Sequence, residues 1–302
     1  MKVLLTGGNG FIGKWVAKRL LEKGINITVF GRRHGKEELA DLVGAEAADK
    51  VRWYIGDVSE YDNVLEASEG CDAIIHIAAL LGPDVAKNPR LGMKVNLGGT
   101  LNIFEAAKKH KIEKLIYTTS AAVFGPEDGL HPKPILHYGA LKLAEEGCAR
   151  AYFLEDGIVS IGFRPFVVYG PCRERGLSAG PSLACMAAAR GKSYVIPFTG
   201  KSNFIYVDDC ASAYERALFS SPEKAEVFNL AGEVVDVNDF IREIKNIVPE
   251  AKISAAGPSI PIAPILSPDG IEKVITNIQR TPMRKAIEDT IDFYRGSASQ
   301  EY

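Results

Sequence analysis

The sequence lacks the features of a disulfide-linked, metal-binding or membrane-spanning protein. Its 302 residues include five cysteines, which are odd in number, widely scattered and without a C-x-x-C pair. Disulfide frameworks and zinc sites need paired spacings of this kind, so we expect free thiols and no metal site. No apolar run approaches the roughly 20 residues of a transmembrane helix. The chain begins directly on its first predicted strand, so we expect a cytoplasmic protein without a signal peptide.

An excess of one charge is also missing. The chain has 36 Lys and Arg residues against 38 Asp and Glu residues, a formal net charge of −2, and no run of basic residues. Nucleic acids and anionic membrane surfaces attract clustered positive charge, so we expect neither as a partner. A chain of this length can bury a large core and form one large domain or two.

The first feature that the sequence does have is a glycine-rich turn between a strand and a helix. The apolar run 1–5 leads into Gly7-x-x-Gly10-x-x-Gly13, and residues 14–23 have helical periodicity. Gly7 permits the tight turn, Gly10 lets the backbone approach a pyrophosphate, and Gly13 lets the helix pack closely on the strand. The phosphates would then meet the helix N-terminus. With a second strand at 25–30, this pattern predicts a dinucleotide-binding site.

The residues after that second strand bear on which dinucleotide is bound. NAD sites usually place Asp or Glu about 20 residues beyond the glycines, to accept hydrogen bonds from the ribose. This chain has Gly31-Arg32-Arg33 there, with no acid before Glu37. A guanidinium suits a 2′-phosphate, so the sequence favours NADP, with NAD as the alternative. The two arginines could instead be solvated at the end of the strand.

Strand and helix patterns alternate through the first half of the chain. This succession predicts an α/β fold with a Rossmann-like, doubly wound parallel sheet. The further predicted strands are 51–55, 72–76, 114–118 and 159–163, and the long predicted helices are 88–109 and 138–155.

The regular alternation ends after residue 170, where loops and a proline-rich stretch follow. We therefore expect a dinucleotide-binding domain over 1–170, to which 204–235 returns. A smaller C-terminal substrate-binding region would consist of 171–203 and 236–302.

Tyr138 and Lys142 carry the predicted chemistry. They are four residues apart on a predicted helix, so they lie on one face, one turn from each other. An ammonium beside a phenol stabilises the phenolate and lets the tyrosine exchange protons closer to neutral pH. Ser120 follows the strand 114–118, at the sheet edge where open α/β folds carry their sites. Its hydroxyl suits holding the substrate oxygen that Tyr138 protonates or deprotonates.

Nearly end to end, the chain resembles the extended short-chain dehydrogenase/reductases, also called the NAD-dependent epimerase/dehydratase family. The resemblance implies an NAD(P)-dependent enzyme in which Ser120, Tyr138 and Lys142 are catalytic and Asn96 supports the lysine through water. It is carried by Thr6–Gly13, Gly56–Val58, His76–Ala79, Asn96–Thr100, Thr118–Gly125, Tyr138-x-x-x-Lys142, Arg164–Pro171 and Phe204–Asp209. The cofactor-binding residues that it implies, beside Arg32 and Arg33, are Gly7, Gly10, Phe11, Ile12, Gly13, Asp57, Val58, Ala78, Ala79, Tyr138, Lys142, Pro165 and Val168.

Departures from the family pattern bear on the reaction. Val167 stands where nucleotide-sugar enzymes typically have Asn, and Ser202-Asn203 stands where they carry an Arg-Asp pair, so two expected diphosphate donors are missing. Ala121-Ala122 replaces the Asp-Glu pair of the 4,6-dehydratases. The leading interpretation is an oxidoreductase that transfers a hydride to or from a secondary alcohol or ketone of a small molecule such as a sugar derivative. The alternatives are a nucleotide-sugar epimerase with tightly held NAD and a non-catalytic dinucleotide sensor.

Several polar residues need separate interpretations. Arg173 and Arg175 follow Gly170-Pro171 and could clamp a carboxylate or phosphate, or face solvent. Asp208 and Asp209 are predicted to cap a helix rather than to bind a metal. His76 is predicted to be packed and hydrogen-bonded at the end of a buried strand. The candidate substrate contacts are Leu81, Ser120, Ala121, Arg173 and Arg175.

The helices that carry Asn96 and Tyr138 have apolar residues on their predicted outer faces. Contiguous exposed apolar patches usually mark an interface. The family resemblance implies pairing of these two helices across a two-fold axis, so we expect a homodimer. The alternative is that the residues pack inward on the sheet. They are Leu101, Phe104 and Ala107 on the first helix, and Leu141, Ala144, Cys148 and Tyr152 on the second.

Overall fold

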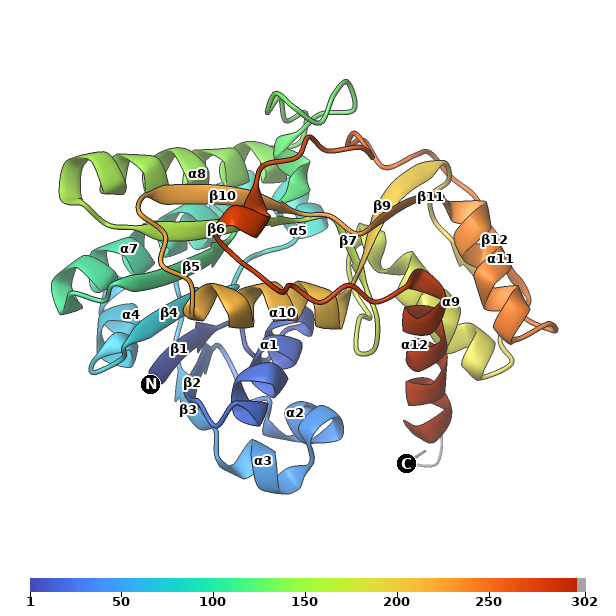
Figure 1. Ribbon diagram of the computed structural model, residues 1–302, viewed down its shortest axis with the longest axis horizontal. Helices are drawn as coiled ribbons and strands as arrows, with labels where there is room; N and C mark the ends of the chain where they lie inside the picture. Colours follow the sequence, from blue (N-terminus) through green and yellow to red (C-terminus); the bar gives the residue numbers. More distant parts are fainter. Residues whose placement is uncertain (298–302) are drawn as a thin grey trace.

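The computed structural model describes residues 1–297, and a seven-stranded parallel sheet forms its centre (Figure 1). The order β10-β6-β5-β4-β1-β2-β3 places the reversal of strand order between β1 and β4. Open α/β sheets bind ligands at the carboxyl ends of the strands beside such a reversal. The predicted doubly wound sheet is confirmed. Its strands are β1 (Lys2–Thr6), β2 (Asn26–Gly31), β3 (Arg52–Ile55), β4 (Ala73–His76), β5 (Lys114–Thr118), β6 (Ser160–Pro165) and β10 (Ala225–Leu230).

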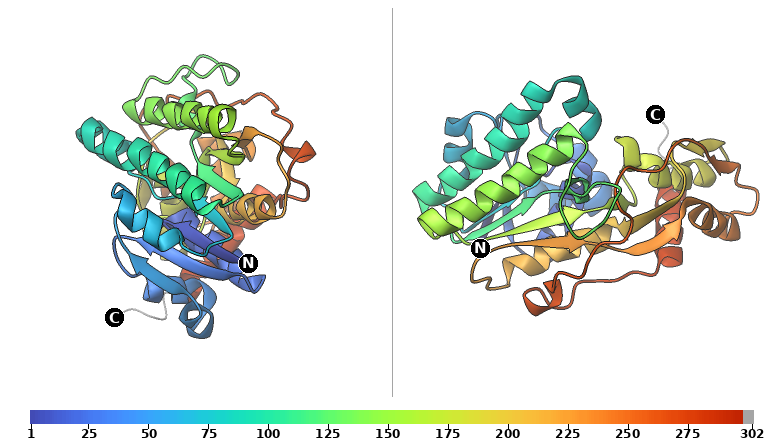
Figure 2. Two further views of the ribbon diagram at one scale, coloured as in Figure 1. Left: turned by 90° about the vertical axis from the view of Figure 1, so that its left-hand side faces the viewer. Right: turned by 90° about the horizontal axis from the view of Figure 1, so that it is seen from above.

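Both faces of this sheet are buried because successive side chains of each strand enter different cores. Val3 and Leu5 pack with the helices of one face, whereas Leu4 packs with those of the other. Figure 2 shows the two helical layers from the side. The first layer holds α1 (Phe11–Glu22), α2 (Lys36–Val43), α3 (Ala45–Asp49) and α10 (Val207–Leu218). The second holds α4 (Tyr61–Ser68), α7 (Gly99–His110) and α8 (His137–Asp156).

The predicted helix 88–109 is divided by a π-helical turn. It consists of α6 (Pro89–Gly92), the π-helical turn η1 (Met93–Gly98) and α7. A π-helical turn inserts extra backbone into a helix and is frequent at functional sites. Here it carries Asn96. The short helices nearby are α5 (Gly82–Lys87) and the 3₁₀ turn η2 (Ala121–Val123).

The smaller part of the molecule lies beside the carboxyl ends of the large sheet (Figure 1). The segments α10 and β10 return to the large sheet, whereas β9 and β11 pair with β7. The last five residues of the predicted region 236–302 lie outside the described residues. This part contains the sheet of β7 (Val167–Tyr169), β9 (Lys201–Tyr206) and β11 (Glu233–Asp236), the pair β8 (Tyr194–Ile196) and β12 (Ile253–Ala255), the turn η3 (Leu177–Ala179), and α9 (Gly180–Ala189), α11 (Val237–Ile247) and α12 (Met283–Ser297). The turn η4 (Ile271–Lys273) lies beside β10 of the large sheet, where Asp269 accepts a hydrogen bond from the Asn229 backbone (Figure 1).

The prediction that Asp208 and Asp209 cap a helix was wrong. Strand β9 continues to Tyr206 and α10 begins at Val207, so both carboxylates fall inside the first helical turn. Negative charge is favourable there because of the helix dipole. Asp208 pairs with Arg19 at 2.8 Å, and Asp209 accepts a hydrogen bond from the Thr281 backbone at 2.7 Å. The two residues therefore fasten α10 to its neighbours.

The outer faces of α7 and α8 are less apolar than predicted. Phe104 and Ala107 are fully buried and pack inward, with Phe104 stacked on Tyr152 at 4.9 Å between ring centroids. The prediction that they face outward was wrong, because these positions fall on the side of α7 that meets the sheet. Leu101, Ala144 and Cys148 stay partly exposed.

Residues 1–297 contain neither a helix suited to a membrane nor a cluster of metal ligands. No helix in this range is long and apolar enough to cross a membrane. No group of three or more His, Cys, Asp or Glu side chains in this range could hold a metal ion. The five cysteines are free.

Candidate active site

The glycine motif forms a tight junction between β1, α1 and β4. Gly7 has a φ of 69°, and a Cβ there would lie 2.7 Å from the backbone nitrogen of Ala78. A Cβ on Gly13 would collide with the carbonyl oxygen of Gly7. Helix α1 begins at Phe11, so the first N–H groups of the helix lie at this junction without intrahelical partners. The junction therefore fits a diphosphate, which accepts hydrogen bonds from a helix N-terminus.

The arginines after β2 have different surroundings. Arg33 is paired with Glu38 at 2.5 Å. Arg32 lies near Asp57, which follows β3. Burial alone would raise the pKa of Asp57, but hydrogen bonds from Ser59 and the charge of Arg32 lower it overall. Arg32 therefore lies near the carboxylate of Asp57, and Arg33 already forms an ion pair with Glu38.

A close backbone contact brings the start of α8 to the turn that follows β5. A Cβ on Gly139 would collide with the carbonyl oxygen of Ala122. Ser120 caps that turn, and its hydroxyl accepts a hydrogen bond from the Ala122 backbone at 3.1 Å. Glycine beside the half-buried Tyr138 thus lets α8 pack against the turn that carries Ser120.

Lys142 is buried beneath this junction. Only 1% of its surface is exposed, and its Nζ donates to the Thr118 carbonyl at 2.7 Å and to Glu145 Oε2 at 3.0 Å. The ring centroid of Tyr138 lies 6.0 Å from Nζ. Burial lowers the pKa of Lys142, but the charges of Glu145 and Tyr138 raise it above its ordinary value. The side chain is therefore a charged ammonium near neutral pH.

Glu145 was not among the predicted site residues. It is fully buried, and burial raises its pKa to about 7 against the opposing charge of Lys142. The spacing of Tyr138, Lys142 and Glu145 is i, i+4, i+7, which places all three on one helical face. That spacing is the signal by which the sequence could have identified Glu145.

A chain of buried polar groups continues from Glu145 across the sheet. Thr100 lowers the pKa of Glu145, its hydroxyl lies 3.1 Å from His76 Nε2, and His76 Nδ1 lies 2.7 Å from the Thr6 hydroxyl. Burial and the charge of Lys142 lower the pKa of His76 to about 3, so the imidazole is neutral. The prediction that His76 is packed and hydrogen-bonded is confirmed.

Asn96 is fully buried and holds the loop that follows β4. Its Oδ1 accepts from the Leu80 backbone nitrogen at 2.7 Å, and its Nδ2 donates to the Leu80 carbonyl at 3.0 Å. Both ends of the amide are therefore engaged by one residue. The predicted water link to Lys142 stays a prediction.

Arg173 and Arg175 differ in exposure, although they lie in one loop. Arg175 faces solvent. The guanidinium of Arg173 lies 5.1 Å from the Phe11 ring, its Nη2 donates to Ser178 at 2.8 Å, and its buried Nε has no partner among residues 1–297. Burial lowers the pKa of Arg173 to about 10. The loop after β4 lies alongside, because a Cβ on Gly176 would meet Leu81 at 3.4 Å and Arg173 at 3.5 Å.

Among the positions that depart from the family pattern, Asn203 has hydrogen-bond partners, whereas the buried hydroxyl of Ser202 has none among residues 1–297. Asn203 Oδ1 accepts from the Gly232 backbone at 2.7 Å, which joins β9 to the start of β11. Val167 is buried in the core, as is Ala121 in its own turn. The proline-rich stretch 258–268 runs alongside the loop 125–130, since the Ala263 nitrogen donates to Gly125 at 2.9 Å.

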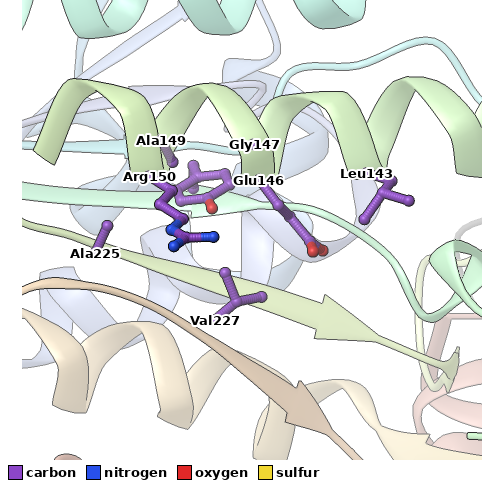
Figure 3. A pocket seen from close by; sticks show the side chains of 8 residues that line it. Leu143, Glu146, Gly147, Ala149, Arg150, Ala225 and Val227 are labelled. Atoms are coloured by element: carbon purple, nitrogen blue, oxygen red, sulfur yellow. The ribbon is translucent and has the colours of Figure 1, made fainter. Parts of the chain in front are cut away.

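Two hollows lie away from these residues. One of about 300 Å³ is lined by residues of α8, β5 and β10, and Glu146 and Arg150 reach into it (Figure 3). Glu146 is paired with Arg164 at 2.5 Å and accepts from Thr119 at 2.7 Å. The other, of about 580 Å³, lies at the amino ends of β5 and β6. Tyr138 and the glycine motif are not among the described residues that line either hollow.

Comparison with known proteins places this geometry in a family. The model of the NAD dependent epimerase/dehydratase family matches residues 3–231. An uncharacterized protein of Methanocaldococcus jannaschii is 30% identical over 250 residues, which cover 76% of this chain and 74% of that protein.

Two 4-epimerases are also similar to this chain. A bifunctional UDP-glucose and UDP-xylose 4-epimerase of Pisum sativum is 32% identical over 164 residues, which span about half of each chain, 49% of this one and 47% of the pea enzyme. The structure of Thermus thermophilus UDP-glucose 4-epimerase in complex with NAD superposes with a TM-score of 0.84 at 25% identity, over 98% of this chain and all of the other.

Proposed function

Because the chain belongs to the NAD-dependent epimerase/dehydratase family, as an enzyme of the extended short-chain dehydrogenase/reductase type, we propose that it is a nucleotide-sugar epimerase. The observation that carries this proposal is the similarity to UDP-glucose 4-epimerases, which for the Thermus thermophilus structure extends over nearly the whole chain. It favours the epimerase alternative over an oxidoreductase that makes a net change in its substrate. In such a reaction, one carbon is oxidised and then reduced again from its other face.

The roles proposed for the residues follow from their positions. Tyr138 removes the proton of the substrate hydroxyl and returns it later, while Ser120 holds the same oxygen. Lys142 stabilises the phenolate of Tyr138 by its buried charge. Asn96 keeps the loop after β4 in place. A nicotinamide held at the glycine junction would supply reversible hydride transfer with the substrate carbon.

The proposed cofactor is NAD, held at the glycine junction. The T. thermophilus enzyme carries NAD, and the junction of Gly7, Gly13 and Ala78 has the close backbone contacts that a diphosphate site needs. NADP, which the sequence favoured, is supported by Arg32 alone, because Arg33 is paired with Glu38. The arginine that remains also lies near Asp57, whose negative charge opposes a 2′-phosphate.

Arg173 is the proposed donor to the diphosphate of the sugar nucleotide. The amide and guanidinium that the family usually supplies are absent at Val167 and Ser202. A buried guanidinium with an unpartnered Nε is costly unless an anion completes it. Contacts with the Phe11 ring and with Ser178 hold the guanidinium of Arg173 in place. We assign the substrate-binding region to 171–203 and 236–297, with Arg175 at its solvent edge.

The first prediction tests this function. We expect the purified protein to carry NAD and to interconvert UDP-glucose and UDP-galactose, or another epimeric pair of sugar nucleotides, without net change in absorbance at the nicotinamide band. Mass spectrometry of the released nucleotide and chromatography of the sugars measure both. Copurified NADP, together with net oxidation or reduction of an alcohol or ketone, would contradict the proposal and support the oxidoreductase.

We also propose that the chain forms a homodimer through α7 and α8. These helices pack side by side at the surface (Figure 2), and Leu101, Ala144 and Cys148 remain partly exposed on them. A two-fold axis along this face would bury the same stripe on both subunits.

The second prediction concerns this interface. Ala144→Arg is expected to give a monomer in light scattering at micromolar concentration, because a packed bundle cannot bury an unpaired guanidinium without a large penalty. Ala45→Arg is the matched control, since Ala45 is exposed on α3, far from α7 and α8, and this variant should remain dimeric. A monomeric wild type, or a dimeric Ala144→Arg, would refute the proposed interface.

A further inference from the structure

Glu145 is a buried carboxylate for which the proposed reaction has no use. It lies on α8 with no exposed surface, and its Oε2 accepts from Lys142 Nζ at 3.0 Å. Burying a carboxylate is costly unless its charge is compensated. The neighbouring Glu146 has such compensation from Arg164, whereas the ammonium of Lys142 is the cation that contacts Glu145. The two side chains therefore depend on each other.

The hydrogen bonds of Lys142 show what this contact does. An ammonium has three N–H donors. One is fixed by the Thr118 carbonyl at the end of β5, and a second by Glu145 on α8. With two donors held from different elements, the direction of the third is set as well. Tyr138 lies on the same face of α8, with its ring centroid 6.0 Å from Nζ.

We propose that Glu145 is a positioning residue that acts through Lys142, keeping the ammonium charged in its buried site and fixing its free N–H on the side of Tyr138. The inference rests on the proposed function, in which Lys142 stabilises the phenolate of Tyr138. Its consequence is that Glu145 sets the upper pH limit of turnover.

The other groups around the pair do not substitute for Glu145. On β4, His76 is neutral, since its pKa is about 3. On β5, burial raises the pKa of Tyr117 well above its ordinary value, so that phenol is neutral too. Along α8, Cys148 also has a raised pKa, first because of burial and then because of Glu145, and Glu146 is already paired with Arg164. Thr100 on α7 lowers the pKa of Glu145 but carries no charge.

The test is Glu145→Gln, which removes the charge and keeps the shape. Without the carboxylate, burial dominates at Lys142 and its pKa falls. In NMR of protein labelled at lysine Cε, the titration midpoint of Lys142 should move to lower pH by about one unit or more. The signal is assigned by its loss in Lys142→Arg. In the pH–rate profile, the alkaline limb should move in the same direction.

Glu146→Gln is the matched control, because it removes the adjacent buried carboxylate, which pairs with Arg164 rather than with Lys142. Because the charge of Glu146 raises the pKa of Lys142 less than that of Glu145 does, the Lys142 midpoint of this variant should move to lower pH by much less than in Glu145→Gln. Should Glu145→Gln fail to fold, Glu145→Asp serves instead, because it keeps the charge on a shorter side chain. Its Lys142 midpoint should lie below that of the wild type. An unchanged Lys142 midpoint in Glu145→Gln would overturn the proposal. The NMR readout needs no substrate, so it stands even if no sugar nucleotide is epimerised.

Discussion

Tyr138→Phe is expected to lower kcat by about 10²–10⁴-fold, the usual contribution of a positioned acid–base group. The substitution removes the transferable proton and keeps the ring, which packs near the backbone of Gly82. Affinity for the dinucleotide should therefore change by no more than a few fold. Turnover is measured by chromatography of the sugar nucleotides, and binding by titration of the cofactor.

Tyr152→Phe provides the control for that experiment. Tyr152 lies on the same helix, but its hydroxyl bonds Glu105 on α7 at 2.7 Å, away from Ser120 and Lys142. Its loss should leave kcat unchanged. If Tyr138→Phe kept more than roughly a tenth of the wild-type kcat, Tyr138 would not be the acid–base group.

Lys142→Met should damage stability and turnover together. It leaves Glu145 as an unpaired buried carboxyl, and breaking one side of such a pair typically costs about 3–5 kcal/mol while the remaining group stays charged. It also removes the charge that stabilises the phenolate of Tyr138, so we expect kcat to fall by about 10²-fold or more, as for the loss of other buried electrostatic groups. Cofactor affinity should fall as well, because the family resemblance implies that this lysine is also a cofactor-binding residue.

The loss of stability should depend on pH with a definite sign. Burial raises the pKa of Glu145 in the folded protein to about 7, above its ordinary value of 4.5, although the charge of Lys142 lowers it. A carboxyl whose folded pKa is raised loses stability as pH rises through that pKa. In the wild type this loss ends near pH 7, whereas in Lys142→Met it continues to higher pH. The difference in unfolding free energy between the wild type and Lys142→Met should therefore increase by about 1.4 kcal/mol per pH unit above pH 7.

Denaturant unfolding at pH 6, 7 and 8 measures this gap. The double variant Lys142→Met/Glu145→Gln is the control, because it carries no orphaned carboxyl and its difference from the wild type should not widen above pH 7. A constant gap for Lys142→Met itself would show that Glu145 does not titrate in this range, and the electrostatic account of the pair would then be wrong.

The large sheet and the location of the candidate site could be predicted from local patterns in the amino-acid sequence. Buried strands, glycine spacing and helical periodicity are local patterns, and each reflects a constraint that acts within a few residues. Gly7 is favoured by its positive φ and Gly13 by its contact with Gly7 inside the same turn, and Tyr138 and Lys142 share a face because of the helical repeat. These predictions needed no knowledge of distant segments.

Contacts between segments far apart in the chain follow from the tertiary structure and could not be predicted from local patterns. Arg19 engages Asp208, and the side of α7 that meets the sheet buries Phe104, so the predicted cap and the predicted outer face were wrong. The burial of Glu145 and the unpartnered Nε of Arg173 likewise follow from packing. The missing donors at Val167 and Ser202 argued against a nucleotide sugar when taken alone, because sequence spacing does not show that an arginine from another loop lies over the start of α1. Desolvation and pairing depend on which segments meet in space, and local periodicity does not encode that.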